Sequence, residues 1–164
     1  MAEQDIKDIS IIGGGPTGLF AAFYAGMRGA SARIIDALPA LGGQLMALYP
    51  EKYIFDVAGF TKILAKDLVR DMAVQGLQFG ATTHLGEVVT GLRRVEGGSE
   101  SHFLLETSAA IYPTRTILIA AGIGSLVHAN QAMTTQTALA AVPRDVAGFT
   151  RGLRNFAYQY LVTW

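Results

Sequence analysis

The chain has 164 residues, of which 51% are hydrophobic and only 16% charged, and its formal net charge is zero. A balanced charge without a basic block argues against nucleic acid or an anionic membrane surface as a partner. The absence of cysteine excludes disulfides, thiolate metal sites and a dithiol redox pair within this chain. The polar start is unlike a signal peptide and no apolar run is as long as a membrane span, so we expect a cytoplasmic protein.

Residues 8–36 have the pattern of a β-α-β unit with a glycine-rich first turn. A β-rich run at 8–12 leads into a G-x-G-x-x-G motif, and an apolar helical stretch continues to about residue 27. The motif and the start of the helix comprise Gly13, Gly14, Gly15, Pro16, Thr17 and Gly18. Its first glycine permits a tight turn, its second lets a pyrophosphate approach the backbone, and its third allows the helix to pack closely on the sheet. Free N–H groups at the helix N-terminus would face the phosphates.

A second apolar run, at 33–35, ends in Asp36, eighteen residues after Gly18. A carboxylate at this place can accept hydrogen bonds from an adenosine ribose. The turn and the acid together predict dinucleotide binding, with an ordinary glycine turn as the alternative.

The rest of the chain continues with mixed elements. Residues 37–59 are predicted to form a long loop over the nucleotide, and 61–77 an amphipathic helix. Apolar runs on either side of a glycine-rich turn at 96–99 predict a hairpin, and a third short strand is expected at 111–112. The run at 116–122 predicts a buried parallel strand that ends in another glycine turn. We therefore expect an α/β fold, with a Rossmann-like parallel sheet, helices and a small antiparallel insert at about 81–114.

This order of elements resembles the FAD-binding half of flavoproteins with two dinucleotide-binding domains. The runs at 13–24, 41–45 and 47–60 are similar to the thioredoxin-reductase-like ferredoxin–NADP reductases. The last of them, ALYPEKYIFDVAGF, is long and specific. The resemblance covers about residues 6–125, so we expect a FAD-binding domain at 1–125 and a divergent tail at 126–164.

The resemblance implies roles for individual residues. Asp36 would hold the adenosine ribose, where glutamate is usual in the family. Gln44 would contact the flavin or its ribityl region, and Tyr49 would lie against the isoalloxazine face. Val88 would bond the adenine edge through its backbone. The other expected cofactor contacts are Gly43, Ala121, Gly122 and Leu126, the last at a position where the family normally has an aromatic residue.

The implied chemistry is hydride transfer from NADPH to FAD and electron transfer to ferredoxin. The cofactor carries this chemistry, so we name no catalytic residue. We also expect no metal site, because His84, His102 and His128 have no acidic partner at ligand spacing.

The family pattern stops after Gly124, and no second G-x-G-x-x-G occurs at 126–164, so the NADP-binding domain is absent from this sequence. Two origins of the tail stay open: a frame-shifted or truncated coding sequence, and a divergent short flavoprotein. Two functional alternatives also stay open: a non-catalytic FAD- or ADP-binding remnant, and a fragment of a related flavoprotein disulfide reductase. The oligomeric state is open, with a homodimer among the options.

Overall fold

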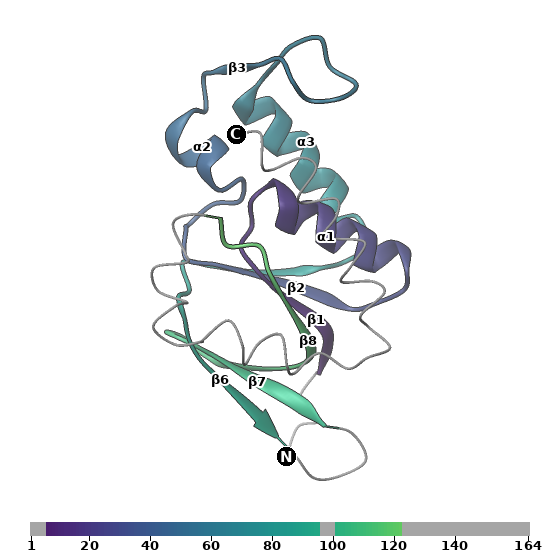
Figure 1. The fold of residues 1–164 in the computed structure, drawn as a ribbon, viewed down its shortest axis with the longest axis vertical. Helices are drawn as coiled ribbons and strands as arrows, with labels where there is room; N and C mark the ends of the chain where they lie inside the picture. Colours follow the sequence, from purple (N-terminus) through teal and green to yellow (C-terminus); the bar gives the residue numbers. More distant parts are fainter. Residues whose placement is uncertain (1–5, 96–100, 123–164) are drawn as a thin grey trace.

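The computed structural model describes residues 6–95 and 101–122. These residues form one six-stranded sheet in the order β5-β2-β1-β8-β7-β6, a two-stranded sheet β3-β4, and three helices (Figure 1). The elements are β1 (Lys7–Ile12), α1 (Pro16–Met27), β2 (Ala32–Asp36), α2 (Gln44–Leu48), β3 (Tyr53–Ile54), β4 (Ile63–Leu64), α3 (Ala65–Leu77), β5 (Thr82–Leu85), β6 (Val89–Val95), β7 (His102–Thr107) and β8 (Ile111–Ile119). The expected α/β fold is confirmed.

The parallel part of the sheet consists of β5, β2, β1 and β8. Its central strands are rich in isoleucine because they are covered on both faces, as buried parallel strands require. Ile9, Ile11 and Ile34 pack against the helices, and Ile12 and Ile35 pack with β7 on the opposite face. This two-sided packing fixes the positions of the strand ends, where the candidate site lies.

Helices α1 and α3 pack side by side on one face of the sheet (Figure 1). The proline at the first position of α1 costs no hydrogen bond, because that N–H has no partner within the helix. At Gly76 of α3, a Cβ atom would lie 2.8 Å from the carbonyl oxygen of Leu19, so glycine allows the two helices to approach closely. The predicted helix at 16–27 is confirmed, and the one predicted at 61–77 begins at Ala65.

The antiparallel part differs in detail from the expected insert. Residues 82–85 were expected at its start, but β5 pairs in parallel with β2 and extends the main sheet. The strands expected at 111–112 and 116–122 are one strand, β8, which pairs with β7 through its first half and with β1 through its second half. Pro113 is tolerated because the pairing with β1 begins only at Thr114, so the proline has a neighbouring strand on one side only.

The long loop expected at 37–59 contains two short elements, α2 and β3. None of the five residues of α2 is buried, so hydrophobic periodicity gave no sign of this helix. The turn at 96–99 is outside the described residues, but the antiparallel pairing of β6 with β7 confirms the predicted hairpin. Leu126, His128 and the tail at 126–164 also lie outside the described residues, and the domain boundary at residue 125 stays a prediction.

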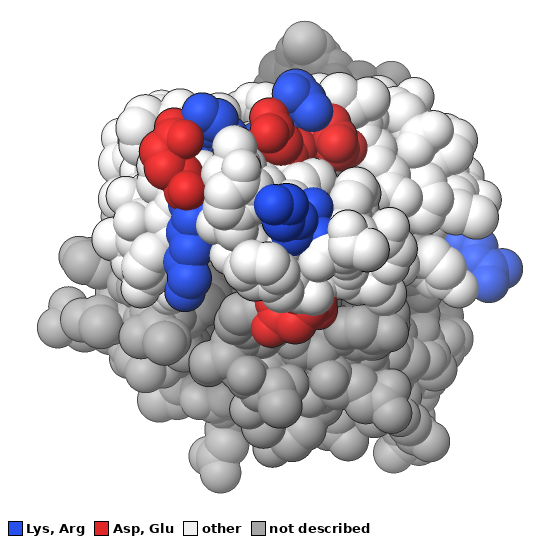
Figure 2. All heavy atoms as spheres, turned by 90° about the horizontal axis from the view of Figure 1, so that it is seen from above, with Lys and Arg blue, Asp and Glu red and all other residues white. Residues whose placement is uncertain are grey.

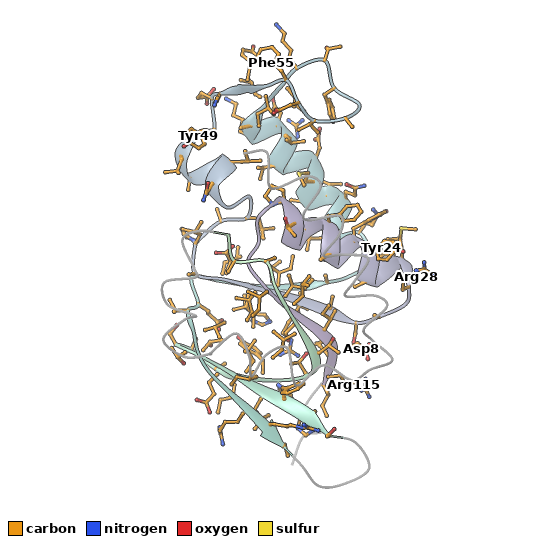
Figure 3. The ribbon with its side chains drawn as sticks, viewed as in Figure 1. Asp8, Tyr24, Arg28, Tyr49, Phe55 and Arg115 are labelled. Atoms are coloured by element: carbon orange, nitrogen blue, oxygen red, sulfur yellow. The ribbon has the colours of Figure 1, made fainter. Side chains whose placement is uncertain are left out.

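A polar cluster around Asp8 lies near the start of β1 (Figure 3). The Asp8 carboxylate accepts hydrogen bonds from the backbone N–H and hydroxyl of Ser31, at 2.8 and 2.7 Å, and from Arg115, at 2.6 Å. Burial raises the pKa of Asp8, but the Ser31 bonds and the Arg115 guanidinium outweigh it and hold the pKa below its usual value. The cluster links β1 to β8 and to the loop before β2.

Candidate functional site

The glycine turn between β1 and α1 is built on close backbone contacts. Gly13 has φ +111°, and a Cβ atom there would lie 2.3 Å from the carbonyl oxygen of Ala120. A Cβ atom at Gly18 would lie 1.8 Å from the carbonyl oxygen of Gly13. Glycine is therefore required where the turn meets the end of β8 and where α1 starts. Ala121 and Gly122 come two and three residues after the end of β8, so the second expected glycine turn adjoins the first.

Asp36 lies at the end of β2 with its side chain turned toward the glycine turn. Its carboxylate accepts hydrogen bonds from the backbone N–H groups of Gly14, at 2.5 Å, and Leu38, at 2.8 Å, and the residue is only 7% exposed. A carboxylate has about four lone-pair sites, so two bonds leave acceptor capacity for a ligand hydroxyl. The acid is thus fixed beside the turn, as a ribose-binding role requires.

The loop after β2 returns to the glycine turn and leaves room beside it. The N–H of Gly42 donates to the carbonyl oxygen of Gly14, at 2.8 Å. A Cβ atom at Gly15 would meet nothing closer than the Cα of Gly43, at 3.9 Å. No side chain caps the N-terminus of α1, and its first turn contains no acid. This backbone surface suits an anion, because N–H groups and the positive end of the helix dipole are both present.

The segment from Gly86 to Val88 lies beside the end of β2. The N–H of Gly86 donates to the carbonyl oxygen of Leu38, and the N–H of Glu87 to that of Asp36, both at 3.0 Å. Val88 donates its N–H to Ser108 Oγ, at 3.2 Å, and its carbonyl oxygen accepts the N–H of Ser108, at 2.9 Å. The expected adenine and ribose contacts are therefore neighbours, although a ligand at Val88 must share or replace a bond to Ser108.

Gln44 and Tyr49 lie at the two ends of α2, which begins directly after Gly43. Gln44 is the exposed first residue of α2, and Tyr49 is the C-cap of the same helix and is 47% exposed (Figure 3). The Lys52 ammonium lies 5.3 Å from the centre of the Tyr49 ring. This end of the molecule carries charged side chains of both signs among uncharged ones (Figure 2). The other large apolar side chains exposed on residues 44–60 are Met46, Leu48, Tyr53, Phe55 and Phe60. The flavin contacts of Gln44 and Tyr49 stay predictions.

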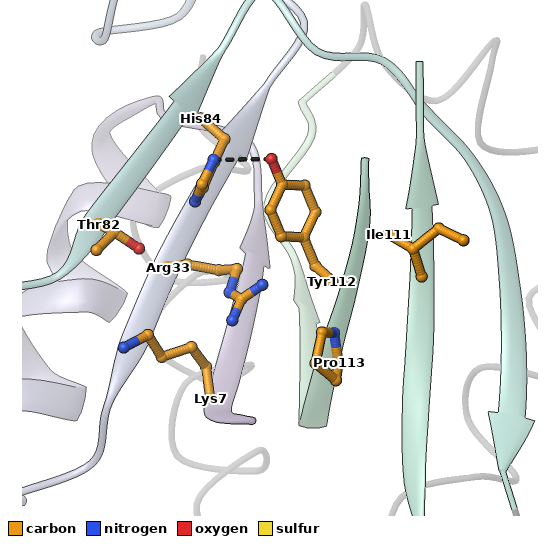
Figure 4. A pocket seen from close by; sticks show the side chains of 7 residues that line it. All are labelled: Lys7, Arg33, Thr82, His84, Ile111, Tyr112 and Pro113. Carbon is orange, nitrogen blue, oxygen red and sulfur yellow. Dashed lines mark hydrogen bonds between the residues drawn. The ribbon is translucent and has the colours of Figure 1, made fainter. Parts of the chain in front are cut away.

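A polar network that the sequence did not predict surrounds the side chain of Glu87, the residue before Val88. The Tyr112 hydroxyl is 2.8 Å from His84 Nδ1 and 2.9 and 3.0 Å from the two oxygens of the Glu87 carboxylate (Figure 4 shows the His84 contact). Thr107 donates its hydroxyl to the same carboxylate, at 2.7 Å. Local spacing does not predict these hydrogen bonds, because they join positions 20 to 28 residues apart. We expected His84 to be an ordinary loop or strand histidine without an acidic partner, but its Nδ1 lies 3.8 Å from the Glu87 carboxylate. No metal-binding cluster occurs within residues 6–95 and 101–122.

The charges of this network follow from burial. Burial lowers the pKa of His84, and the nearby Arg33 lowers it further against the opposing effect of Glu87. Burial and the hydrogen bond to Glu87 raise the pKa of Tyr112. Both groups are therefore neutral at pH 7. Since the one hydroxyl proton of Tyr112 goes to the Glu87 carboxylate, His84 must carry its own proton on Nδ1 to bond the phenolic oxygen.

A pocket of about 330 Å³ opens next to the network (Figure 4). The Arg33 guanidinium lies 4.8 Å from the centre of the Tyr112 ring. The pocket is lined by Lys7, Arg33, Thr82, His84, Ile111, Tyr112 and Pro113. It is lined from the amino-terminal ends of β1 and β8, whereas the glycine turns follow the carboxyl ends of those strands. In open α/β sheets, ligands bind outside the carboxyl ends, so the glycine turns are the better candidate site.

Comparison with known proteins shows what this part of the chain is similar to. Residues 11–72 match the family described as "NAD(P)-binding Rossmann-like domain". Over 123 residues the chain is 50% identical to ferredoxin–NADP reductase 2 of Shouchella clausii and to a ferredoxin–NADP reductase of Halalkalibacterium halodurans. Over these residues the chain is similar to the ferredoxin–NADP reductases. The match covers 75% of this chain but 36% of each of these relatives.

The described fold is also similar to that of solved flavoprotein reductases. The thioredoxin reductase of T. acidophilum superposes with a TM-score of 0.62 and 28% identity, covering 73% of this chain and 36% of that one. The expected resemblance is therefore confirmed for the N-terminal part of the chain. Among the residues that the structure describes, no helix is long and apolar enough to cross a membrane. The cytoplasmic location stays a prediction.

Proposed function

We propose that this chain binds FAD, and that it supplies the FAD-binding part of an oxidoreductase that passes electrons between NADPH and ferredoxin. The observation that carries the proposal is the backbone cradle of Gly13 to Gly18 with the Asp36 carboxylate fixed beside it. The chain spans about a third of the curated relatives that it matches, so the whole reaction is proposed for a longer protein of this type.

The residues present fit the ADP half of the cofactor. The open side of Gly15 and the uncapped start of α1 would face the pyrophosphate. Asp36 has acceptor capacity left for the ribose, and Val88 lies one residue from the Glu87 N–H that bonds the Asp36 carbonyl. The glycine turn alone does not separate FAD from a nicotinamide dinucleotide. Gln44 and Tyr49 are proposed to make that distinction by receiving the flavin end.

The chain's own part in the reaction is to bind and orient. Bound FAD would supply the hydride and electron chemistry, and no side chain of this chain has to act as an acid or base. The cradle would hold the cofactor by its adenosine and phosphates, far from the reacting ring. The electron acceptor is proposed from similarity: identity is 50% to proteins named ferredoxin–NADP reductase and 28% to the T. acidophilum thioredoxin reductase. A homodimer stays a prediction.

The proposal is tested by loading the purified chain with FAD and recording its visible spectrum. We expect a yellow protein whose bound flavin is displaced by excess ADP, because both ligands would use the same cradle. A chain that takes up neither FAD nor ADP contradicts the proposal.

Anaerobic addition of NADPH then separates the alternatives. Loss of the flavin absorbance supports reductase activity of this chain. A yellow protein that keeps its absorbance supports the non-catalytic FAD-binding alternative. For a longer protein of this type, comparing the reduction of ferredoxin with the reduction of a disulfide substrate distinguishes a ferredoxin reductase from a disulfide reductase.

A further inference from the structure

The Glu87 carboxylate is held by two side chains of the antiparallel part of the sheet. Tyr112 of β8 donates to it at 2.9 and 3.0 Å, and Thr107 at the end of β7 donates at 2.7 Å. Only 15% of the Glu87 side chain is exposed. Hydrogen bonds to a carboxylate are stronger than those between neutral groups, and burial increases the cost of losing them.

The backbone of the same residue belongs to the candidate nucleotide site. The Glu87 N–H bonds the carbonyl oxygen of Asp36, whose side chain bonds the glycine turn. Val88, the expected adenine contact, is the next residue. Its backbone N–H and carbonyl oxygen are bonded to Ser108, which follows Thr107 in the sequence. Glu87 thus connects the turn at 107–110 and Tyr112 with the edge of the sheet where the adenosine half would bind.

We propose that Glu87 is a positioning residue for adenine recognition. Its carboxylate, bonded by Tyr112 and Thr107, holds the 86–88 segment in place, so that an adenine edge can share or replace the bonds between the Val88 backbone and Ser108. His84 supports the same geometry, because it bonds the Tyr112 oxygen and so directs the hydroxyl proton toward Glu87. The inference rests on the proposed function, since it needs an adenine nucleotide in the cradle.

The test compares ADP with GDP, because adenine and guanine present different donors and acceptors at the edge that a backbone would contact. The variants are Glu87→Gln, which replaces one acceptor oxygen with a donor, and Tyr112→Phe, which removes the hydroxyl. Glu106→Gln is the matched control, because Glu106 pairs with Arg93 at the surface of the β6–β7 hairpin. Affinities are measured by calorimetry on the full chain, and urea unfolding gives the stability of each variant.

We expect the wild-type chain to prefer ADP. Glu87→Gln and Tyr112→Phe should lower ADP affinity by about tenfold, the effect of one lost hydrogen bond to a charged group, while GDP affinity changes by less than about twofold. A purely structural role would weaken both nucleotides equally, and that result overturns the inference. So does an unchanged ADP affinity in a folded variant, or an equal ADP loss in Glu106→Gln. A wild-type chain that binds no adenine nucleotide overturns the proposed function itself, and the inference with it.

Discussion

The closest backbone contact of the glycine turn can be tested by adding one carbon atom. In Gly18→Ala, the new Cβ would lie 1.8 Å from the carbonyl oxygen of Gly13. Real Cβ contacts are essentially never shorter than 3.0 Å, so the two groups must separate by about 1.2 Å. Neither partner can rotate away, because one is a backbone carbonyl and the other is attached directly to the backbone.

The effect on stability combines two terms. Overpacking of this kind costs about 1–3 kcal/mol, and alanine in a helix is favoured over glycine by about 1 kcal/mol. With backbone on both sides of the clash we expect the upper end of that range, and therefore a net loss of about 2 kcal/mol in the free energy of unfolding. Urea denaturation measures it.

The effect on binding should be larger than stability alone explains. A hydrogen bond lengthened by about 1 Å is effectively broken, and each bond to a charged phosphate contributes about 1.5–3 kcal/mol. ADP affinity of Gly18→Ala should therefore fall by at least about tenfold.

Gly29→Ala is the control, at the other end of α1. Gly29 has φ +74° and open space around it, so alanine costs about 1 kcal/mol in strain without touching the cradle. If Gly18→Ala binds ADP as tightly as the wild type, or if both variants lose the same affinity, the close contact between Gly18 and the Gly13 carbonyl is not needed for ADP binding.

Four further outcomes are expected. Asp36→Asn should lower both ADP affinity and stability, because the amide places a donor near the Gly14 or Leu38 N–H. Calorimetry measures the ADP affinity and urea unfolding the stability, and an unchanged ADP affinity would contradict a ribose contact. The lowered pKa of Asp8 means that its stabilising effect is present above its usual pKa of 3.8 and is lost as the pH falls through the lower folded value, so Asp8→Asn should flatten the acid side of a stability–pH profile. Ser10 Oγ is buried without a hydrogen-bond partner among the described residues, so Ser10→Ala should leave the thermal midpoint unchanged or raise it, and a clear drop would reveal a partner. Leu105 is fully buried, and Leu105→Ala should cost about 2–5 kcal/mol in urea unfolding, against less than about 1 kcal/mol for the exposed Lys66→Ala.

Local patterns in the sequence were sufficient for the first third of the fold. The apolar run at 8–12, the glycine turn and the apolar run that ends in Asp36 predicted β1, α1 and β2, because these elements depend on neighbours close in sequence. Helix α2 was missed because it is only five residues long and none of them is fully buried, so it carries no periodic signal.

Features that depend on strand pairing were harder to predict. Pro113 suggested a break in the strand, because proline lacks the N–H that a strand with two neighbours needs. The sequence does not show that Pro113 has a neighbouring strand on one side only. The Glu87–Tyr112 contact was missed for a related reason: it joins positions 25 residues apart, and only the register of the sheet brings them together. Gln44 and Tyr49 were assigned by resemblance, and their exposed positions leave those roles to experiment.

The double pairing of β8 also has a consequence for how the chain folds. β1 pairs on one side with β2, about 25 residues later, but its other neighbour is more than 100 residues away. Long-range pairing of this kind closes slowly, whereas the β6–β7 hairpin can form from local contacts. During synthesis, one edge of β1 therefore stays open until residues 114–119 leave the ribosome, and an open edge of isoleucine-rich strand invites pairing with other chains. Truncation before Thr114 should consequently yield an aggregating product rather than a smaller folded domain.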